Sequence, residues 1–137
     1  MSMPGTVFAD NLLEMRHTRG VVVAQVIEVL PHPNAEFIRL AVIDLGDGIE
    51  RQVVYGGQRQ LHPGDLVPAA PPGAYVACKG KMRRRNYRGQ SSYGMLCSTD
   101  ELGWTDDGPD EVAVLAPDLR VGESLDGCLG PLFPSER

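Results

Sequence analysis

The residues best suited to chemistry are positive charges gathered in one short stretch. Six cations lie within the ten residues 79–88, and no acidic residue interrupts them: Lys79, Lys81, Arg83, Arg84, Arg85 and Arg88. Cations packed this densely repel one another unless a negative partner lies nearby. Arginine predominates, and its planar guanidinium binds phosphate through paired hydrogen bonds and stacks on bases. We consider two interpretations, a phosphate-contacting loop and a solvated charged hairpin.

Aromatic and hydroxyl side chains are interleaved with these cations. Tyr87 lies inside the basic stretch and Tyr93 follows it, an arrangement that suits base stacking beside phosphate contacts. Ser91 and Ser92 are suited to donate hydrogen bonds to a phosphate or a ribose. The segment that contains them lacks the spacing of a nucleophile elbow, and no acid–base pair has a defined spacing. We therefore expect a binding site and no catalytic site.

The net charge of the whole chain argues against nucleic-acid binding. The net charge is −5 and the isoelectric point is about 5.1, whereas nucleic-acid-binding proteins are more often basic. Acidic residues dominate from Cys97 onward, so the chain divides into a basic stretch and an acidic remainder. This asymmetry permits a local basic site on an acidic protein.

Cysteine and histidine give no sign of a metal site or a disulfide framework. The 3 cysteines and 3 histidines are scattered, and no CxxC pair is present. We expect no metal and no cofactor, with the cysteines as small core or near-surface residues. His32 stands between two prolines, which favours a structural role with hydrogen bonds to the local backbone.

Glycine and proline punctuate the chain, and short β-branched runs lie between them. This pattern predicts an all-β barrel or sandwich. A hairpin turn is expected at Gly46-Asp47-Gly48, because Asp-Gly accepts positive φ. A short helix is expected at residues 7–16 and a helical turn at residues 100–102. The expected strands are residues 21–30, 37–45, 52–55, 66–70, 74–78 and 112–115.

The length of 137 residues suits one domain, 1–137, with a single modest core. We place that core at about residues 20–104, and a C-terminal extension at residues 105–137. No apolar segment is long enough to span a membrane, and the first residues lack the features of a signal peptide. We therefore expect a cytoplasmic protein without membrane association.

Several motifs, in order along the chain, resemble the tRNA-binding domain family. The matching segments are residues 21–36, ending PHPNAE, then 53–57 (VVYGG), 67–74 (VPAAPPGA), 88–98 (RGQSSYGMLCS) and 101–103 (ELG). The resemblance runs from residue 21 to residue 103 and continues more weakly through residues 118–125. The family includes a domain near the N-terminus of bacterial phenylalanyl-tRNA synthetase β chains, appendages of methionyl-tRNA synthetases and free-standing tRNA-binding proteins.

The resemblance implies an oligonucleotide-binding (OB) fold, a five-stranded Greek-key barrel, with short helical and extended terminal additions. It places Asn34, Arg88, Ser91, Gly94 and Met95 at or beside an RNA site, although backbone geometry and packing are a second explanation for Gly94 and Met95. With the basic stretch included, the expected RNA-binding residues are Asn34, Lys79, Lys81, Arg83, Arg84, Arg85, Tyr87, Arg88, Ser91, Tyr93 and Met95. The chain departs from the family at Phe37, where lysine is frequent, and at residues 58–60, where asparagine is usual.

The leading hypothesis is non-catalytic binding of tRNA or another structured RNA, by shape rather than by sequence. The alternative is a protein-interaction or export-chaperone-like dimeric module, with Leu129, Leu132 and Phe133 as exposed contacts. A homodimer is expected under either hypothesis, because a symmetric pair doubles the few contacts of one small barrel. Association with an aminoacyl-tRNA synthetase is a further expectation from the resemblance.

Overall fold

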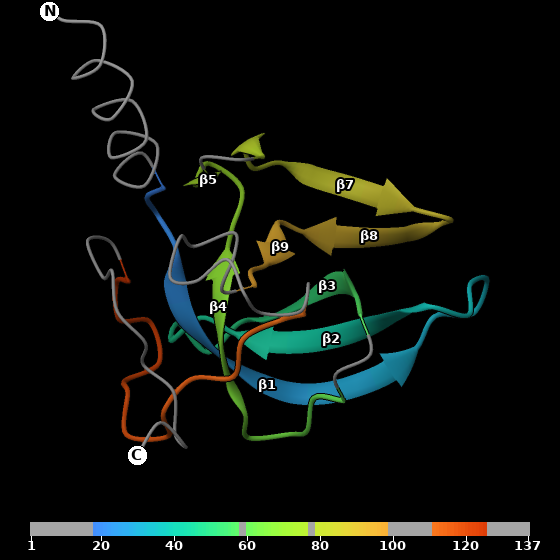
Figure 1. Cartoon of the computed structure of the whole chain (residues 1–137). Helices are drawn as coiled ribbons and strands as arrows, with labels where there is room; N and C mark the ends of the chain where they lie inside the picture. Colours follow the sequence, from blue (N-terminus) through green and yellow to red (C-terminus); the bar gives the residue numbers. More distant parts are fainter. Residues whose placement is uncertain (1–17, 58–59, 77–78, 99–110, 126–137) are drawn as a thin grey trace, which may run out of the picture.

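A computed structural model describes residues 18–57, 60–76, 79–98 and 111–125. Every regular element within these ranges is a β-strand, and five strands form one antiparallel sheet in the order β3-β2-β1-β4-β9 (Figure 1). The five are β1 (Val22–Pro31), β2 (Ile38–Asp44), β3 (Glu50–Gly56), β4 (Leu66–Ala70) and β9 (Met95–Leu96). The all-β expectation is confirmed, and the helix and helical turn expected at residues 7–16 and 100–102 lie outside the described residues.

The long first strand serves two neighbours. Residues 22–25 of β1 pair with β4, and residues 25–31 pair with β2, with a register shift between Val26 and Glu28. A bulge of this kind bends a strand and increases its twist, so β1 curves from one side of the barrel to the other. β2 returns as β3 through the expected turn, where Gly46 and Gly48 have positive φ and the Asp44 carboxylate accepts both of their N–H groups.

Two small hairpins follow β4 and stand over the open side of this sheet. They are β5 (Tyr75–Val76) with β6 (Gly80–Lys81), and β7 (Arg84–Tyr87) with β8 (Gln90–Tyr93). The Val54 N–H of β3 donates to the buried Ser92 Oγ of β8 at 2.9 Å, and Gln52 Nε2 donates to the Ser91 carbonyl at 2.9 Å. These bonds join β3 to β8, and the curled sheet forms a half-barrel, which is consistent with the OB fold that the resemblance implied.

Apolar side chains fill both faces of β1 and β4. One cluster occupies the barrel interior and includes Val26, Ile43, Val53 and Val67. A second cluster covers the outer face and includes Val23, Val76, Met82, Cys97, Leu115 and Leu125. Burial on both faces explains why all five residues of β4 are buried and confirms a core position for Cys97.

The acidic C-terminal part supplies much of the outer cover. Leu115 N–H donates to the Leu66 carbonyl, and Leu125 N–H donates to the Val21 carbonyl, so residues 111–125 run beside β1 and β4. This segment is orange to red in Figure 1. The strand expected at residues 112–115 is wrong, because only Val112 forms a bridge, with Ser98, before the backbone turns to bond with Leu66 instead. Among the described residues, no helix has the length and apolar character needed to cross a membrane.

Candidate nucleic-acid interface

The basic stretch folds mainly as a β-hairpin. Arg84 to Tyr87 pair with Gln90 to Tyr93, and every residue of β7 is exposed. A two-residue turn of Arg88 and Gly89 joins the strands, with φ of 53° and 90°. Two successive positive φ values are the geometry of the tight hairpin turns that match strand twist. The backbone of this segment is therefore a hairpin with exposed charges, as the second interpretation expected. Because β7 is exposed, its arginine side chains are still accessible to a ligand.

The hairpin divides the basic residues between two surfaces, because successive side chains of a strand point to opposite faces. Arg85 and Tyr87 line a groove beside β3. Arg84 lies on the opposite face, with Ser91 and Tyr93. The cations that are contiguous in the sequence do not form one patch, and only some of them face the groove.

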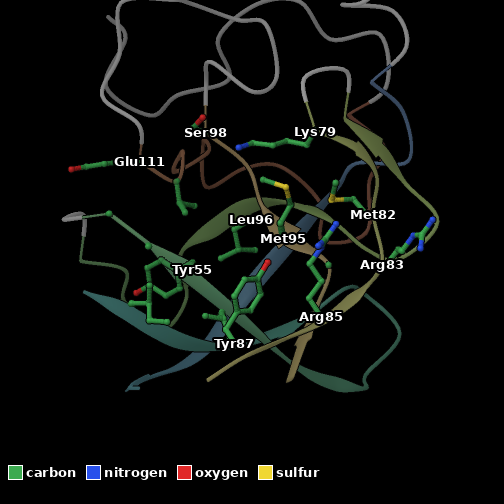
Figure 2. A pocket seen from close by; sticks show the side chains of 16 residues that line it. Tyr55, Lys79, Met82, Arg83, Arg85, Tyr87, Met95, Leu96, Ser98 and Glu111 are labelled. Carbon is green, nitrogen blue, oxygen red and sulfur yellow. The ribbon is translucent and has the colours of Figure 1, made fainter. Parts of the chain in front are cut away.

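The groove has a volume of about 420 Å³ and lies between β3, β9 and the β7–β8 hairpin (Figure 2). Its cationic lining is Lys79, Arg83 and Arg85. Arg83 and Arg85 make no salt bridge with any part of the chain that the structure describes. Tyr87 adds an aromatic ring, and the apolar lining comes from Ile38, Val54, Met82, Met95, Leu96 and Val112. The groove thus combines an apolar surface with the positive charge of Arg83 and Arg85.

Tyr55 closes the wall of the groove on the β3 side and is only 5% exposed. Burial raises the pKa of Tyr55, and nearby Arg39 and the Leu61 backbone oppose that shift. Neither of these groups makes a hydrogen bond of acceptable geometry, so the hydroxyl has no partner among the described residues. It remains neutral at ordinary pH, with its hydrogen-bonding capacity unused.

The tip of the hairpin is tied to the turn between β1 and β2. His32 is buried, and its Nε2 lies 2.7 Å from the Tyr87 carbonyl oxygen. Its Nδ1 accepts the Asn34 N–H at 2.9 Å, so the neutral imidazole must carry its proton on Nε2 and donate it to Tyr87. Asn34 Nδ2 donates to the Arg88 carbonyl at 3.2 Å. The structural role expected for His32 is confirmed, and the bond to Tyr87 spans 55 residues.

The opposite face of the hairpin is held by a stack of side chains. The guanidiniums of Arg51 and Arg84 lie 4.8 Å and 5.1 Å from the centre of the Tyr93 ring. Arg51 also pairs with Asp47 at 2.9 Å, and the hydrogen bond from Arg51 is the main cause of the lowered pKa of Asp47. Tyr93 therefore has two cationic partners within the protein, and it lies on the face of the hairpin away from the groove.

Adjacent serines have different surroundings. The Ser91 side chain is exposed on the face away from the groove. Ser92 is fully buried, accepts the Val54 N–H and donates to the Gly94 carbonyl at 2.9 Å. Gly94 has a φ of 80°, and a Cβ there would collide with the Ala70 carbonyl oxygen. Gly94 is thus required by backbone geometry, the second explanation given above.

The residues predicted for the RNA site fall into several places. Those that line the groove are Lys79, Arg83, Arg85, Tyr87 and Met95, which also packs against the outer core. Arg84, Ser91 and Tyr93 lie on the opposite face, Asn34 and Arg88 meet at the hairpin tip, and Lys81 lies exposed on β6. Tyr55, Met82 and Glu111 line the groove although the sequence did not single them out.

Within the described residues, no three His, Cys, Asp or Glu side chains gather in a way that would hold a metal ion. Phe37, where the family often has lysine, is 84% exposed and immediately precedes β2. Its neighbour Ile38 lines the groove. The positive charge of the groove therefore comes from residues 79–85, which include one strand of the hairpin, and not from the β1–β2 turn.

Comparison with known proteins decides the family. Residues 21–124 match the family model described as "Putative tRNA binding domain". The chain belongs to the tRNA-binding domain family. Among curated relatives, it is 39% identical over 109 residues to the phenylalanine–tRNA ligase β subunit of Chlorobaculum tepidum, and 41% identical over 106 residues to that of Neisseria gonorrhoeae. Each match covers 77% of this chain and only 13% of the relative's length.

The solved structures with a similar fold are more distant in sequence than these curated relatives. A methionyl-tRNA synthetase related protein from Pyrococcus horikoshii aligns with a TM-score of 0.57 at 18% identity, over 85% of this chain and 94% of that one. The C-terminal domain of Plasmodium vivax p43 aligns with a TM-score of 0.56 at 22% identity, over 84% of this chain and 67% of that one. These alignments support the shared OB-like fold.

Proposed function

We propose that this tRNA-binding domain binds tRNA or another structured RNA through the groove, without a catalytic step of its own. The observation that carries the proposal is the pair Arg83 and Arg85, which line the groove without a salt bridge in the described structure. Neighbouring cations repel each other, and a phosphate between them relieves that repulsion. Arginine is also the side chain best shaped to bind phosphate.

The proposal extends to the partners of the protein and to its compartment. The curated relatives quoted above are β subunits of phenylalanine–tRNA ligase, so a synthetase is the partner class that we propose, and the cytoplasm is the compartment. A homodimer remains our expectation from the small size of one barrel. The residues on which the protein-interaction alternative depends, Leu129, Leu132 and Phe133, lie outside the described residues, and no observation favours it.

The experiment measures binding of bulk tRNA to the full chain by fluorescence anisotropy, at about 50 and 200 mM salt. The groove variant changes Lys79, Arg83 and Arg85 to alanine. A matched control changes Lys81, Arg88 and Arg120, which removes the same charge from residues that do not line the groove. If three phosphates are neutralised, wild-type affinity falls by roughly 20- to 40-fold between the two salt concentrations.

We expect the groove variant to lose most of the affinity and most of the salt dependence. The control should lose less, because its three charges act on the RNA only through screened, longer-range attraction. Absence of salt-sensitive binding by the wild-type protein would reject the proposed function. Equal losses in the two variants would place the RNA site outside the groove.

A further inference from the structure

The groove offers more than positive charge, because much of its lining is apolar. Val54, Met82 and Leu96 are buried side chains of this lining, and Met95 is half-buried. Methionine sulfur is polarisable and makes favourable contacts with aromatic rings. A site that bound only phosphates would have no use for such a surface, since phosphates are hydrated anions.

Tyr87 lies at the edge of this apolar surface. Its side chain is 40% exposed and lines the groove, and Figure 2 shows the ring between Tyr55 and Arg85. The bond between His32 and the Tyr87 carbonyl fixes the backbone that carries the ring. An exposed aromatic ring on a fixed backbone is a stacking platform that costs little ordering when a flat ligand binds.

Base faces are accessible only when the bases are unpaired. In an RNA helix the bases stack on one another, and a protein meets mainly the sugar and phosphate groups. Unpaired bases can instead lie on aromatic side chains while arginine binds the backbone. The volume of about 420 Å³ falls within the range of about 300–1,000 Å³ in which proteins bind small organic ligands, and a helix is too wide to enter it.

The position of the groove within the fold supports the same conclusion. OB folds bind oligonucleotides on the face of their second and third strands, between the loop after the first strand and the loop before the last. Here those loops are the β1–β2 turn and the segment that contains β7 and β8, and His32 and Asn34 bond them together. The hairpin that forms one wall of the groove is therefore held in place by the β1–β2 turn.

We infer that the groove takes an unpaired stretch of RNA, with a base stacked on Tyr87 and the apolar lining and its phosphates on Arg83 and Arg85. This inference rests on the proposed function and narrows it. It replaces the expectation that the protein recognises the shape of an RNA helix. The structured parts of a tRNA would then contact the protein only outside the groove.

The test compares a fluorescein-labelled single-stranded RNA of about one dozen nucleotides, a span within the range of OB-fold sites, with a blunt duplex of the same sequence. The proteins are the full wild-type chain, Tyr87→Ala and Tyr87→Phe, and thermal unfolding confirms that each is folded. We expect the single strand to bind at least tenfold more tightly than the duplex. Tyr87→Ala should weaken single-strand binding by about 5- to 100-fold, whereas Tyr87→Phe should stay within about twofold because the ring remains.

Binding of the duplex should not change in either variant. Equal affinity for the two RNAs, or no effect of Tyr87→Ala on the single strand, overturns the inference. In that case salt-sensitive tRNA binding that depends on Lys79, Arg83 and Arg85 leaves the proposed function intact. If no RNA binds to the wild-type protein, both the inference and the proposed function are rejected.

Discussion

Replacement of Ser92 by alanine tests how the barrel closes. The Ser92 hydroxyl accepts the Val54 N–H and donates to the Gly94 carbonyl, both at 2.9 Å, in a fully buried position. Alanine would leave these two backbone groups without a partner and too deep for water to replace it. Each unsatisfied buried group costs about 1–3 kcal/mol, so we expect the two together to lower the free energy of unfolding by about 2–6 kcal/mol.

The assay is urea unfolding followed by far-ultraviolet circular dichroism, with thermal unfolding beside it. For a domain of this size the loss corresponds to a fall in Tm of roughly 10 °C or more. Ser91→Ala is the matched control, because the same hydroxyl is removed one residue earlier from an exposed side chain. The control should stay within about 0.5 kcal/mol of wild type.

Hydrogen exchange adds a local measure of the same contact. The Val54 amide should exchange faster in Ser92→Ala than in Ser91→Ala, since it has lost its acceptor. If the two variants unfold at the same urea concentration and the Val54 amide is equally protected in both, the side-chain closure of the barrel that we describe is wrong.

Three further predictions concern the backbone and the surface. Gly94→Ala should lower the free energy of unfolding by about 3 kcal/mol or more, measured in urea, because of its positive φ and the collision described above. Arg88→Asn should stabilise the turn by about 0.5–1 kcal/mol in the same assay, and unchanged tRNA affinity in this variant would exclude Arg88 as an RNA contact. The lowered pKa of Asp47 stabilises the fold only while its carboxylate is charged, so the contribution is complete above pH about 4 and is lost as the pH falls through the lowered pKa. Arg51→Ala should raise that pKa in an NMR titration.

Local patterns were sufficient to predict β1 to β4 and one turn. The β-branched run that became β1 and the Asp-Gly turn after β2 depend on residues adjacent in sequence, and both were found where expected. The strand expected at residues 112–115 failed because its hydrogen bonds go to Cys97 and Leu66 on different elements. Its apolar residues indicate burial, and burial alone does not specify a strand.

The position of the basic stretch was predictable, but its division between two faces was not. That division depends on the register of β7 with β8, and a shift of one residue would exchange the faces. Arg84 and Arg85 are equivalent in the sequence, yet one stacks on Tyr93 and the other lines the groove. The role of Ser92 was missed for the same reason, since burial of one serine and exposure of the next appears only when β8 lies beside β3.

The link between His32 and Tyr87 connects folding to binding in this molecule. The imidazole accepts from Asn34 on one side and donates to Tyr87 on the other, so one neutral side chain holds two loops that are 55 residues apart. If the hairpin were free, a ligand would have to fix its position on binding, and that ordering would reduce the affinity. In this protein the hydrogen bonds of His32 and Asn34 already hold the hairpin in position before any ligand binds. On the opposite face of the same hairpin, Arg51 and Arg84 stack on Tyr93 and hold the hairpin against β3. Some of the cations therefore support the hairpin, and others line the groove.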